Sequence, residues 1–313
     1  MNKCLVTKLN GSSNNSELLR LGEMRIKILK VQNPTDHTQG FSLGFNKPVT
    51  LEIVSDGYFT DKTLTENKGK KITLDAGLNS IWVNGTHDVE IAILDKYSLT
   101  QILFYYIGEA SDTYANNIKF NIADLKYSNA LTNISMDGSQ VSGNIGDLKS
   151  LTALTTLSLF NSQVSGNIGD LKSLTALTKL FLSNAQIPIT GDIGVLSVMS
   201  KCEEMTLQYG RFTGDLATTP ALCRFISFTH DKGSVLTWST RPSTARIIAM
   251  EGEASLTNID KMLQDQAQCQ VGFSSSDYPQ YKVISIAGNR TSASDAAVET
   301  LQQKGYTVSI TKA

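Results

Sequence analysis

Apolar residues recur at a fixed spacing in the middle of the chain. Residues 141–163 and 164–186 are two consecutive 23-residue units that differ at only four pairs of positions. Each unit contains the pattern L-x-x-L-x-L, whose leucines are Leu154, Leu157, Leu159, Leu177, Leu180 and Leu182. The L-x-L part alternates apolar and polar positions, which predicts a short strand with one buried face. A tandem repeat of such units predicts a solenoid, in which each coil packs on its neighbours.

The same pattern continues with weaker identity on both sides of the duplicated pair. Further strands are predicted at 99–104, 131–136, 202–207, 223–228, 245–250, 281–286 and 306–310. This gives about eight or nine coils, more than the three or so that a solenoid needs. Helical periodicity predicts two C-terminal helices, at 257–268 and at 294–304. Ser294 is the expected N-cap of the second helix and Gly305 its end. With the last strand, these helices are expected to cap the solenoid.

Residues 1–95 lack the 23-residue period and show short alternating strands instead. The alternating apolar residues are Met24, Ile26, Ile28, Phe41, Leu43, Phe45, Val49, Leu51, Ile53, Ile72, Leu74, Ile81, Val83, Val89, Ile91 and Ile93. Turn residues separate these segments, which predicts a small β-sandwich of the immunoglobulin-like or jelly-roll kind. The predicted fold class is therefore α+β: a β-sandwich-like attachment domain at 1–95, followed by a capped solenoid at 96–313.

The repeated unit resembles the leucine-rich repeat. Its G-N-I-G segment, followed by L-x-x-L, is similar to the G-x-I-P half of plant-type repeats, with Gly146 and Gly169 in place of proline. The opening MNKCLVTKLNGSSNNSELLRLGEMRIKI resembles the start of uncharacterised proteins from phages and prophages of gut Bacteroidales. The segment ISIAGNRTSASDAAVETLQQKGYTVSI is similar to the terminal cap of leucine-rich-repeat proteins from the same bacteria. The resemblance implies a parallel sheet on a concave face and a place in a virion.

Composition excludes several classes of function. The chain is 41% hydrophobic and 18% charged, with a formal net charge of −1. A nucleic-acid binder needs clustered Lys and Arg, so that class is excluded. No stretch approaches 18 apolar residues, and the first residues show no apolar signal-peptide core, so neither membrane insertion nor secretion by a signal peptide is expected. No catalytic or metal-binding motif is present, so we expect no enzyme activity, no cofactor and no metal site.

A few polar and sulfur-containing residues need separate interpretation. His230 and Asp231 are adjacent, and we expect them to lie in a surface turn rather than to form a catalytic dyad. Asp260, Asp265, Glu203 and Glu204 are interpreted as solvated side chains. Asn161 and Asn184 follow the repeat strand and are expected to hydrogen-bond backbone groups of the next turn.

Cys202 and Cys223 occupy equivalent inward positions in consecutive coils. Stacked coils place such Cα atoms about 4.8 Å apart, which is within disulfide range. Parallel side chains in register rarely reach the required dihedral angle, so buried free thiols are expected and a disulfide remains the alternative.

The solvent-facing positions of the repeat strands are the candidate binding site. Three of the four differences between the duplicated units fall at these outward positions, Thr156/Lys179, Ser158/Phe181 and Phe160/Ser183. Random drift at tolerant surface sites would explain this, as would diversification of a binding surface; we favour the latter. The predicted partner-binding residues are Tyr105, Thr156, Ser158, Phe160, Lys179, Phe181, Ser183, Glu204, Thr206, Gln208, Phe225 and Ile247.

The sequence favours a non-enzymatic recognition protein. The concave face would bind a protein or glycan on a host cell surface, and the N-terminal domain would attach to other virion proteins in a tail or head appendage. The alternatives are a structural virion or scaffold protein whose solenoid packs against sister copies as a homo-oligomer, and a bacterial surface adhesin. The alternatives to a location in the virion are the cytoplasm, or the cell surface by a non-classical route. A glycan-processing enzyme would need a carboxylate pair in a cleft, for which the sequence gives no reason.

Overall fold

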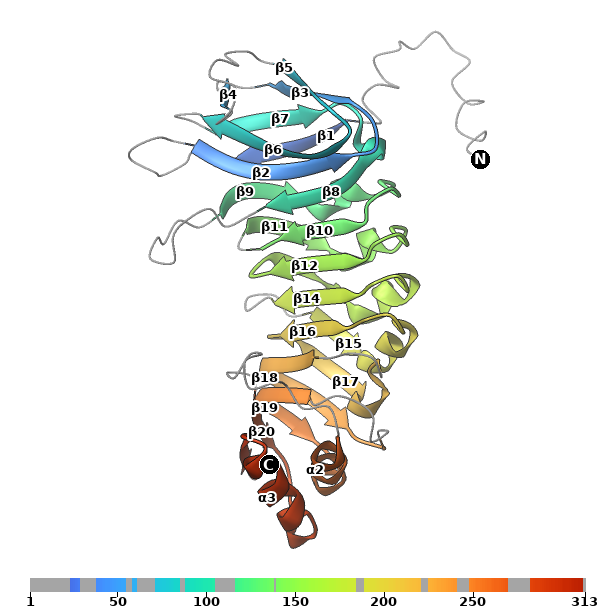
Figure 1. Ribbon diagram of the computed structural model, residues 1–313, viewed down its shortest axis with the longest axis vertical. Helices are drawn as coiled ribbons and strands as arrows, with labels where there is room; N and C mark the ends of the chain where they lie inside the picture. The colour runs from blue at the N-terminus through green and yellow to red at the C-terminus, as the bar shows by residue number, and fades with distance from the viewer. Residues whose placement is uncertain are drawn as a thin grey trace.

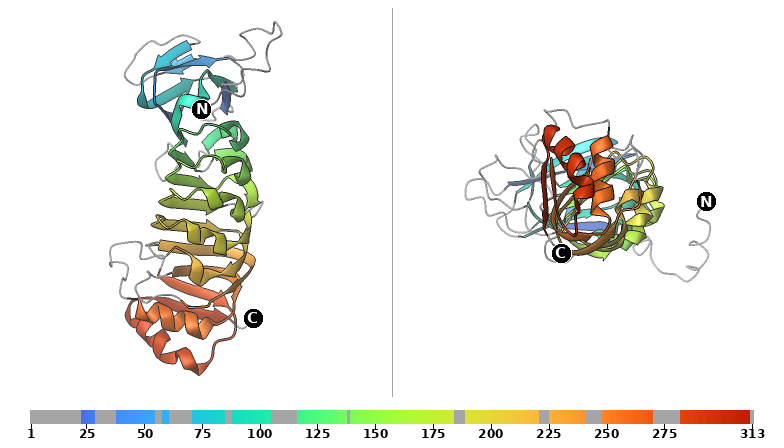
Figure 2. Two further views of the ribbon diagram at one scale, coloured as in Figure 1. Left: turned by 90° about the vertical axis from the view of Figure 1, so that its right-hand side faces the viewer. Right: turned by 90° about the horizontal axis from the view of Figure 1, so that it is seen from below.

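The chain forms a tall column of β-strands in a computed structural model (Figure 1 and Figure 2). The structure describes residues 23–28, 38–54, 58–60, 71–84, 88–104, 116–137, 139–183, 189–220, 225–240, 248–269 and 282–311. Antiparallel strands make up the N-terminal end of the column, and parallel strands make up the rest. Two helices lie beside the strands at the C-terminal end.

The N-terminal strands form two antiparallel groups. Their bounds are β1 (Met24–Ile28), β2 (Thr38–Phe45), β3 (Val49–Ile53), β4 (Tyr58–Thr60), β5 (Lys71–Leu74), β6 (Gly77–Asn84) and β7 (Val89–Ile93). One group has the order β5-β3-β7-β1 and the other the order β4-β6-β2. Every segment in which the sequence predicts an alternating strand lies in one of these elements. Phe41, Leu43, Leu51 and Ile91 are among the side chains that fill the core between them.

Both antiparallel groups continue into the solenoid without a break. β1 pairs antiparallel with β9 (Asn116–Asn121), and β2 pairs antiparallel with β8 (Leu99–Phe104). The core also continues, because Phe104 makes edge-to-face contacts with Phe41 and Phe120 at 6.2 and 6.0 Å between ring centroids. The N-terminal strands therefore lie directly on the first coil and cover its apolar layer, so the two regions share one core.

The leucine pattern forms the first parallel ladder. After β8 it contains β10 (Asn133–Met136), β12 (Thr156–Phe160), β14 (Lys179–Ser183), β16 (Glu204–Gln208), β18 (Phe225–Thr237), β19 (Ile248–Leu256), β20 (Val283–Ala287) and β21 (Thr307–Thr311). Leu157 pairs in register with Leu180, one repeat later, and both are fully buried. The predicted repeat strands are confirmed, and the leucines form the interior of a solenoid.

A second parallel ladder lies opposite the first and was not predicted. It contains β9, β11 (Ser139–Asn144), β13 (Gln163–Asn167), β15 (Ile189–Asp192) and β17 (Arg211–Asp215). Each strand leads into a short 3-10 helix: η3 (Ile122–Leu125), η4 (Ile145–Leu148), η5 (Ile168–Ser173), η6 (Ile193–Val198) and η7 (Leu216–Thr218). The long strand β18 pairs with both β16 and β17, so the two ladders meet there.

A row of Asn and Asp side chains fixes the turns of the second ladder. The side-chain oxygen of Asn144 accepts a hydrogen bond from the backbone N–H of Gly146 at 2.8 Å, and Asn167 does the same with Gly169. Asn121, Asp192 and Asp215 repeat the contact in other coils. These side chains satisfy N–H groups that a helix start leaves free. Asn161, for which we expected such a role, is exposed with a left-handed φ of 55°, and Asn184, for which we expected the same, lies outside the described residues.

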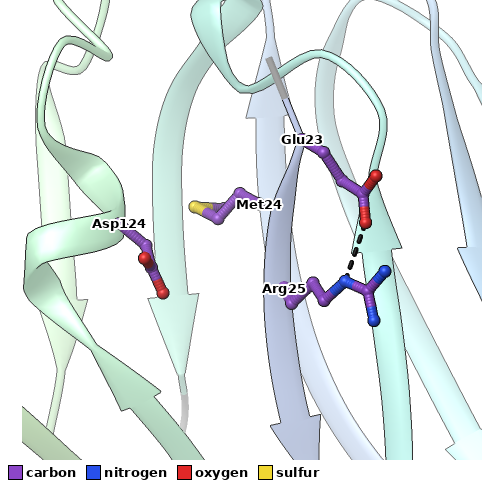
Figure 3. A pocket seen from close by; sticks show the side chains of 4 residues that line it. All are labelled: Glu23, Met24, Arg25 and Asp124. Atoms are coloured by element: carbon purple, nitrogen blue, oxygen red, sulfur yellow. Dashed lines mark hydrogen bonds and ion pairs between the residues drawn. The ribbon is translucent and has the colours of Figure 1, made fainter. Parts of the chain in front are cut away.

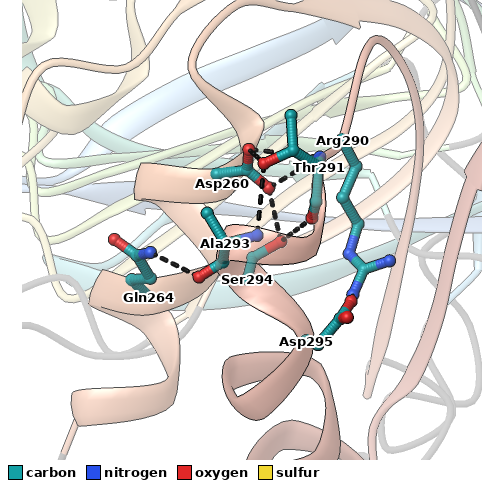
Figure 4. A network of polar contacts seen from close by, with 7 residues as sticks. All are labelled: Asp260, Gln264, Arg290, Thr291, Ala293, Ser294 and Asp295. Atoms are coloured by element: carbon teal, nitrogen blue, oxygen red, sulfur yellow. Dashed lines mark hydrogen bonds and ion pairs between the residues drawn. The ribbon is translucent and has the colours of Figure 1, made fainter.

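The C-terminal end contains both predicted helices, slightly shorter than expected. They are α2 (Ile259–Gln268) and α3 (Asp295–Gln303), the latter preceded by η9 (Ser292–Ser294). Gly305 follows α3 with a φ of 86°, as its predicted role at the helix end requires. Ser294 occupies the N-cap position, but its side chain makes no cap hydrogen bond, so that part of the prediction is wrong. Its hydroxyl donates to Asp260 of α2 at 2.5 Å instead (Figure 4).

Candidate functional site

The candidate site is the solvent side of strands β12, β14 and β16, which we call the strand face. The ladder register aligns its side chains in three rows that cross the strands. The rows are Thr156–Lys179–Glu204, Ser158–Phe181–Thr206 and Phe160–Ser183–Gln208. The inward residues between them, such as Leu157 and Leu180, are fully buried. The strand face therefore collects nine of the predicted binding residues on one surface of three adjacent coils.

Exposure separates these nine residues into two kinds. Lys179 is exposed, and Thr156, Phe160, Phe181, Glu204 and Gln208 are partly exposed. Ser158, Ser183 and Thr206 are only 5%, 1% and 6% exposed, so the prediction that they face solvent is wrong. Strands about 4.8 Å apart bring short hydroxyl side chains beneath the longer ones on neighbouring strands. A partner would thus meet the aromatic and long side chains, with the hydroxyls lying below them.

The charges on the strand face neutralise one another. Lys179 and Glu204 are directly opposite in register, and the Lys179 Nζ lies 3.1 Å from the Glu204 Oε2. The side chains are 47% and 32% exposed to solvent, so their ion pair contributes only about 0.2–1 kcal/mol to stability. Within the three rows these two charges cancel, and the Asp137 carboxylate beside Ser158 adds one negative charge at the edge of the strand face.

Asp137 holds the end of β12 in place. Its Oδ1 accepts hydrogen bonds from the Phe160 backbone N–H at 3.1 Å and from the Ser158 hydroxyl. Its Oδ2 lies 3.4 Å from the Ser135 hydroxyl. The carboxylate thereby fixes the backbone that carries Phe160. The apolar pattern carries no signal of this positioning role, because Ser158 and Phe160 lie one coil away from Asp137.

One buried hydroxyl on the strand face finds no partner among the described residues. The Ser183 Oγ is enclosed and makes no hydrogen bond with any part of the chain that the structure describes. It lies between Phe160 and Gln208 in its row. A buried hydroxyl without a hydrogen bond costs about 1–3 kcal/mol, and because this one is enclosed, a partner docked on the surface does not reach it.

The side chains of three further predicted site residues lie outside the described part of the structure. Tyr105 and Ile247 lie outside the described residues. The Phe225 backbone pairs with Glu204 in register and so extends the first row, although its side chain is outside the description.

The described residues contain no evident catalytic or metal centre. Within them, no group of three or more His, Cys, Asp and Glu side chains could hold a metal ion. His230 and Asp231 lie in strand β18 rather than in the predicted turn, because the chain there joins the two ladders. Cys202 is a buried free thiol, as expected, and Cys223 lies outside the described residues. Among the described segments, no helix has the length and apolarity needed to cross a bilayer.

Asp265 is not the solvated residue that the sequence suggested. It is only 5% exposed, and its Oδ2 accepts a hydrogen bond at 2.9 Å from the indole N–H of the fully buried Trp238. Its other oxygen pairs with Lys261 one turn earlier in α2. Helix periodicity alone could not show this, because Trp238 belongs to a segment before the helix. These contacts hold α2 against the solenoid.

A shallow pocket of about 560 Å³ lies where β1 meets η3 (Figure 3). Glu23, Met24, Arg25 and Asp124 line it. Arg25 is already paired with Glu23 at 2.7 Å and with Glu90 at 2.6 Å, and these hydrogen bonds raise its pKa. Burial raises the pKa of Asp124, with a nearby Lys96 opposing the shift. The pocket therefore offers no uncompensated charge that points to a ligand.

Comparison with known proteins shows only distant similarity. No family model and no curated protein matches the chain. The leucine-rich-repeat ectodomain of the receptor kinase SOBIR1 from Arabidopsis thaliana is 23% identical over 38% of this chain and 61% of that one, with a TM-score of 0.30. The BIR2 ectodomain from Arabidopsis thaliana is 19% identical over 46% of this chain and 66% of that one, with a TM-score of 0.31. The plant peptide hormone receptor RGFR1, in complex with RGF2, is 12% identical over 69% of this chain and 48% of that one, with a TM-score of 0.35. The chain spans less than two thirds of each.

Proposed function

We propose that the protein is a non-enzymatic recognition protein that binds its partner on the strand face. One observation carries the proposal: two coils differ at only four positions, and three of these differences lie together on this surface. Their buried leucines and their Asn turns are unchanged. In a solenoid the inward positions are constrained by packing, so a change of specificity has to use the outward ones.

The chemistry of the strand face suggests the kind of partner. Phe160 and Phe181 are partly exposed aromatics, which commonly provide the main contacts of an interface. The charges of Lys179 and Glu204 cancel within the three rows, and Thr156 and Gln208 are partly exposed polar side chains that can hydrogen-bond to a partner. These features suit a protein or glycan that presents apolar groups together with hydrogen-bonding groups.

The remainder of the proposal concerns attachment and setting. We interpret the antiparallel strands before residue 96 as a β-sandwich-like unit that attaches to other virion proteins, and α2, α3 and β21 as the cap of the solenoid. The setting is a phage tail or head appendage, and the partner is a structure on the surface of the host cell. The sequence resemblance to proteins of Bacteroidales phages supports this setting.

The decisive experiment combines Phe160→Ser with Phe181→Ser and measures binding to Bacteroidales cells. Because truncating an interface aromatic costs about 1–2 kcal/mol or more, we expect the double variant to lose affinity at least about tenfold. Tyr127→Ser is the matched control, since Tyr127 is an exposed aromatic on a turn after η3. A folded double variant that binds cells like the wild type would overturn the proposal. Wild-type protein that binds no cells but assembles through this face would indicate a structural role.

A further inference from the structure

The last strand of the leucine ladder leaves one edge open. β21 pairs with β20 in five consecutive register pairs, from Val283 opposite Thr307 to Ala287 opposite Thr311. No other described strand pairs with it. Thr307, Ser309 and Thr311 are exposed, while Val308 and Ile310 are partly buried and face the same side as the core residues Ile284 and Ile286 of β20.

The hydrogen bonds of β21 show which backbone groups are open. The Thr307 N–H donates to the Lys282 carbonyl, and the Thr311 carbonyl accepts from the Gly288 N–H, both at 2.9 Å. Alternate residues of a parallel strand bond to the same neighbour, so Thr307, Ser309 and Thr311 bond towards β20. The N–H and carbonyl groups of Val308 and Ile310 consequently point away from the ladder.

This edge lacks the features that usually prevent strand addition. Proteins protect edges with charges, proline, bulges or very short strands. At the other end of the column, β4 has only three residues, and β5 begins with Lys71, whose Nζ lies 3.3 Å from a Glu52 carboxylate oxygen. β21 contains no charged residue and no proline, and its register has no bulge.

We propose that β21 pairs antiparallel with β21 of a second copy, about a twofold axis that passes beside Ser309. In this register Val308 lies opposite Ile310 of the second copy, and Thr307 lies opposite its Thr311. The sequence Thr-Val-Ser-Ile-Thr thus places apolar residues opposite apolar ones and hydroxyls opposite hydroxyls. The two Val–Ile pairs are also the positions with outward backbone groups, so each exchanges two hydrogen bonds, about four in total.

The proposed dimer has a consequence for the strand face, although it does not rest on the proposed function. A twofold axis perpendicular to the sheet keeps the same face of both copies on the same side. The two leucine ladders would then form one sheet, with the strand faces side by side and the N-terminal strands at its two ends. Such a dimer would present two copies of the same binding surface to a repetitive target, which increases avidity.

The test uses the full chain and a charge at the proposed axis. Sedimentation equilibrium should show a dimer for the wild type and a monomer for Ser309→Lys and for Ser309→Glu, because each places two like charges opposite one another. Mixing these two variants should restore a dimer that contains one copy of each. Thr190→Lys, on an exposed position of β15 between two paired strands, should leave the dimer intact.

Two outcomes would overturn the proposal. One is a wild-type protein that stays monomeric at high micromolar concentration. The other is a dimer that persists in both Ser309 variants, which would place the contact on another surface. Circular dichroism spectra that match the wild type establish that the variants are folded, so loss of the dimer cannot be assigned to unfolding.

Discussion

At the scale of single residues, each coil constrains the next through a glycine. Gly166 has a φ of 132°, and a Cβ there would lie 2.6 Å from the Asn144 Oδ1 of the preceding coil. Gly143, Gly191 and Gly214 meet the equivalent Asn or Asp oxygens at 2.6, 2.4 and 2.0 Å. The glycine is therefore needed for both its backbone conformation and its small size, since the side chain that fixes one turn occupies the space beside the next.

We predict that Gly166→Ala destabilises the protein by more than Gly77→Ala does. Gly77 also has a positive φ, 104°, but nothing lies within 4 Å of a Cβ placed there. An unfavourable φ costs about 1–3 kcal/mol at either position, and the clash with Asn144 adds to that cost only at Gly166. Urea unfolding followed by circular dichroism measures both losses in free energy of unfolding. Equal losses would show that the Asn row places no steric limit on the glycine.

At the scale of elements, the apolar pattern predicted which side chains point inward. It predicted less well which outward side chains are exposed and which strands pair with one another. Alternation located the N-terminal strands and the leucine strands, because it reports which side chains point inward. It could not show that Ser158 and Ser183 are covered, since that depends on neighbouring coils. Most strands of the second ladder, like Gln163–Asn167, contribute one buried side chain among those described, and β9 contributes two, Ile118 and Phe120. One or two buried positions are too few for a pattern. The second ladder is held together by backbone pairing between its strands and by the Asn side chains at its turns.

The contact between α2 and α3 is another element-scale feature that the sequence did not reveal (Figure 4). Asp260 accepts hydrogen bonds from the Thr291 hydroxyl at 2.6 Å and from the Ser294 hydroxyl. Gln264 donates to the Ala293 carbonyl at 2.8 Å, and Arg290 pairs with Asp295. Desolvation raises the pKa of Asp260, but the hydrogen bonds from Ser294 and Thr291 outweigh it and hold the pKa below its usual value.

We predict from this shift that the helix contact weakens in acid. A carboxylate whose pKa is lowered by folding stabilises the protein fully above its unfolded pKa of about 3.9, and this stabilisation is lost as the pH falls through the lowered value. Asp260→Asn should therefore lower the free energy of unfolding at pH 7, and the difference from the wild type should shrink below about pH 4. Urea unfolding at pH 7 and below about pH 4 measures this difference in the free energy of unfolding. Glu299→Gln, at an exposed position of α3, is the control. A difference that stays constant with pH would contradict the assignment to Asp260.

At the scale of the whole molecule, the column is one continuous structure built from interchangeable coils. The antiparallel strands extend both ladders, and the core passes through the junction. Within the solenoid, coils repeat their contacts: the Thr155 hydroxyl donates to the Thr132 carbonyl, and the Thr178 hydroxyl donates to the Thr155 carbonyl, each 23 residues later. The stability of such a protein is close to a sum over coils and the interfaces between neighbours.

We therefore predict that one coil can be removed whole but not in part. Deleting residues 141–163 joins Gln140 to Val164, which reproduces the sequence at the original junction, and brings Thr178 to the place of Thr155 beside Thr132. This variant should fold and unfold in one cooperative transition, with a melting temperature lowered by a few degrees because one coil interface is lost. Deleting only residues 141–151 would align turns with strands, so that variant should fail to fold. Circular dichroism and thermal unfolding distinguish them, and equal disruption by both deletions would show that the coils are not independent units.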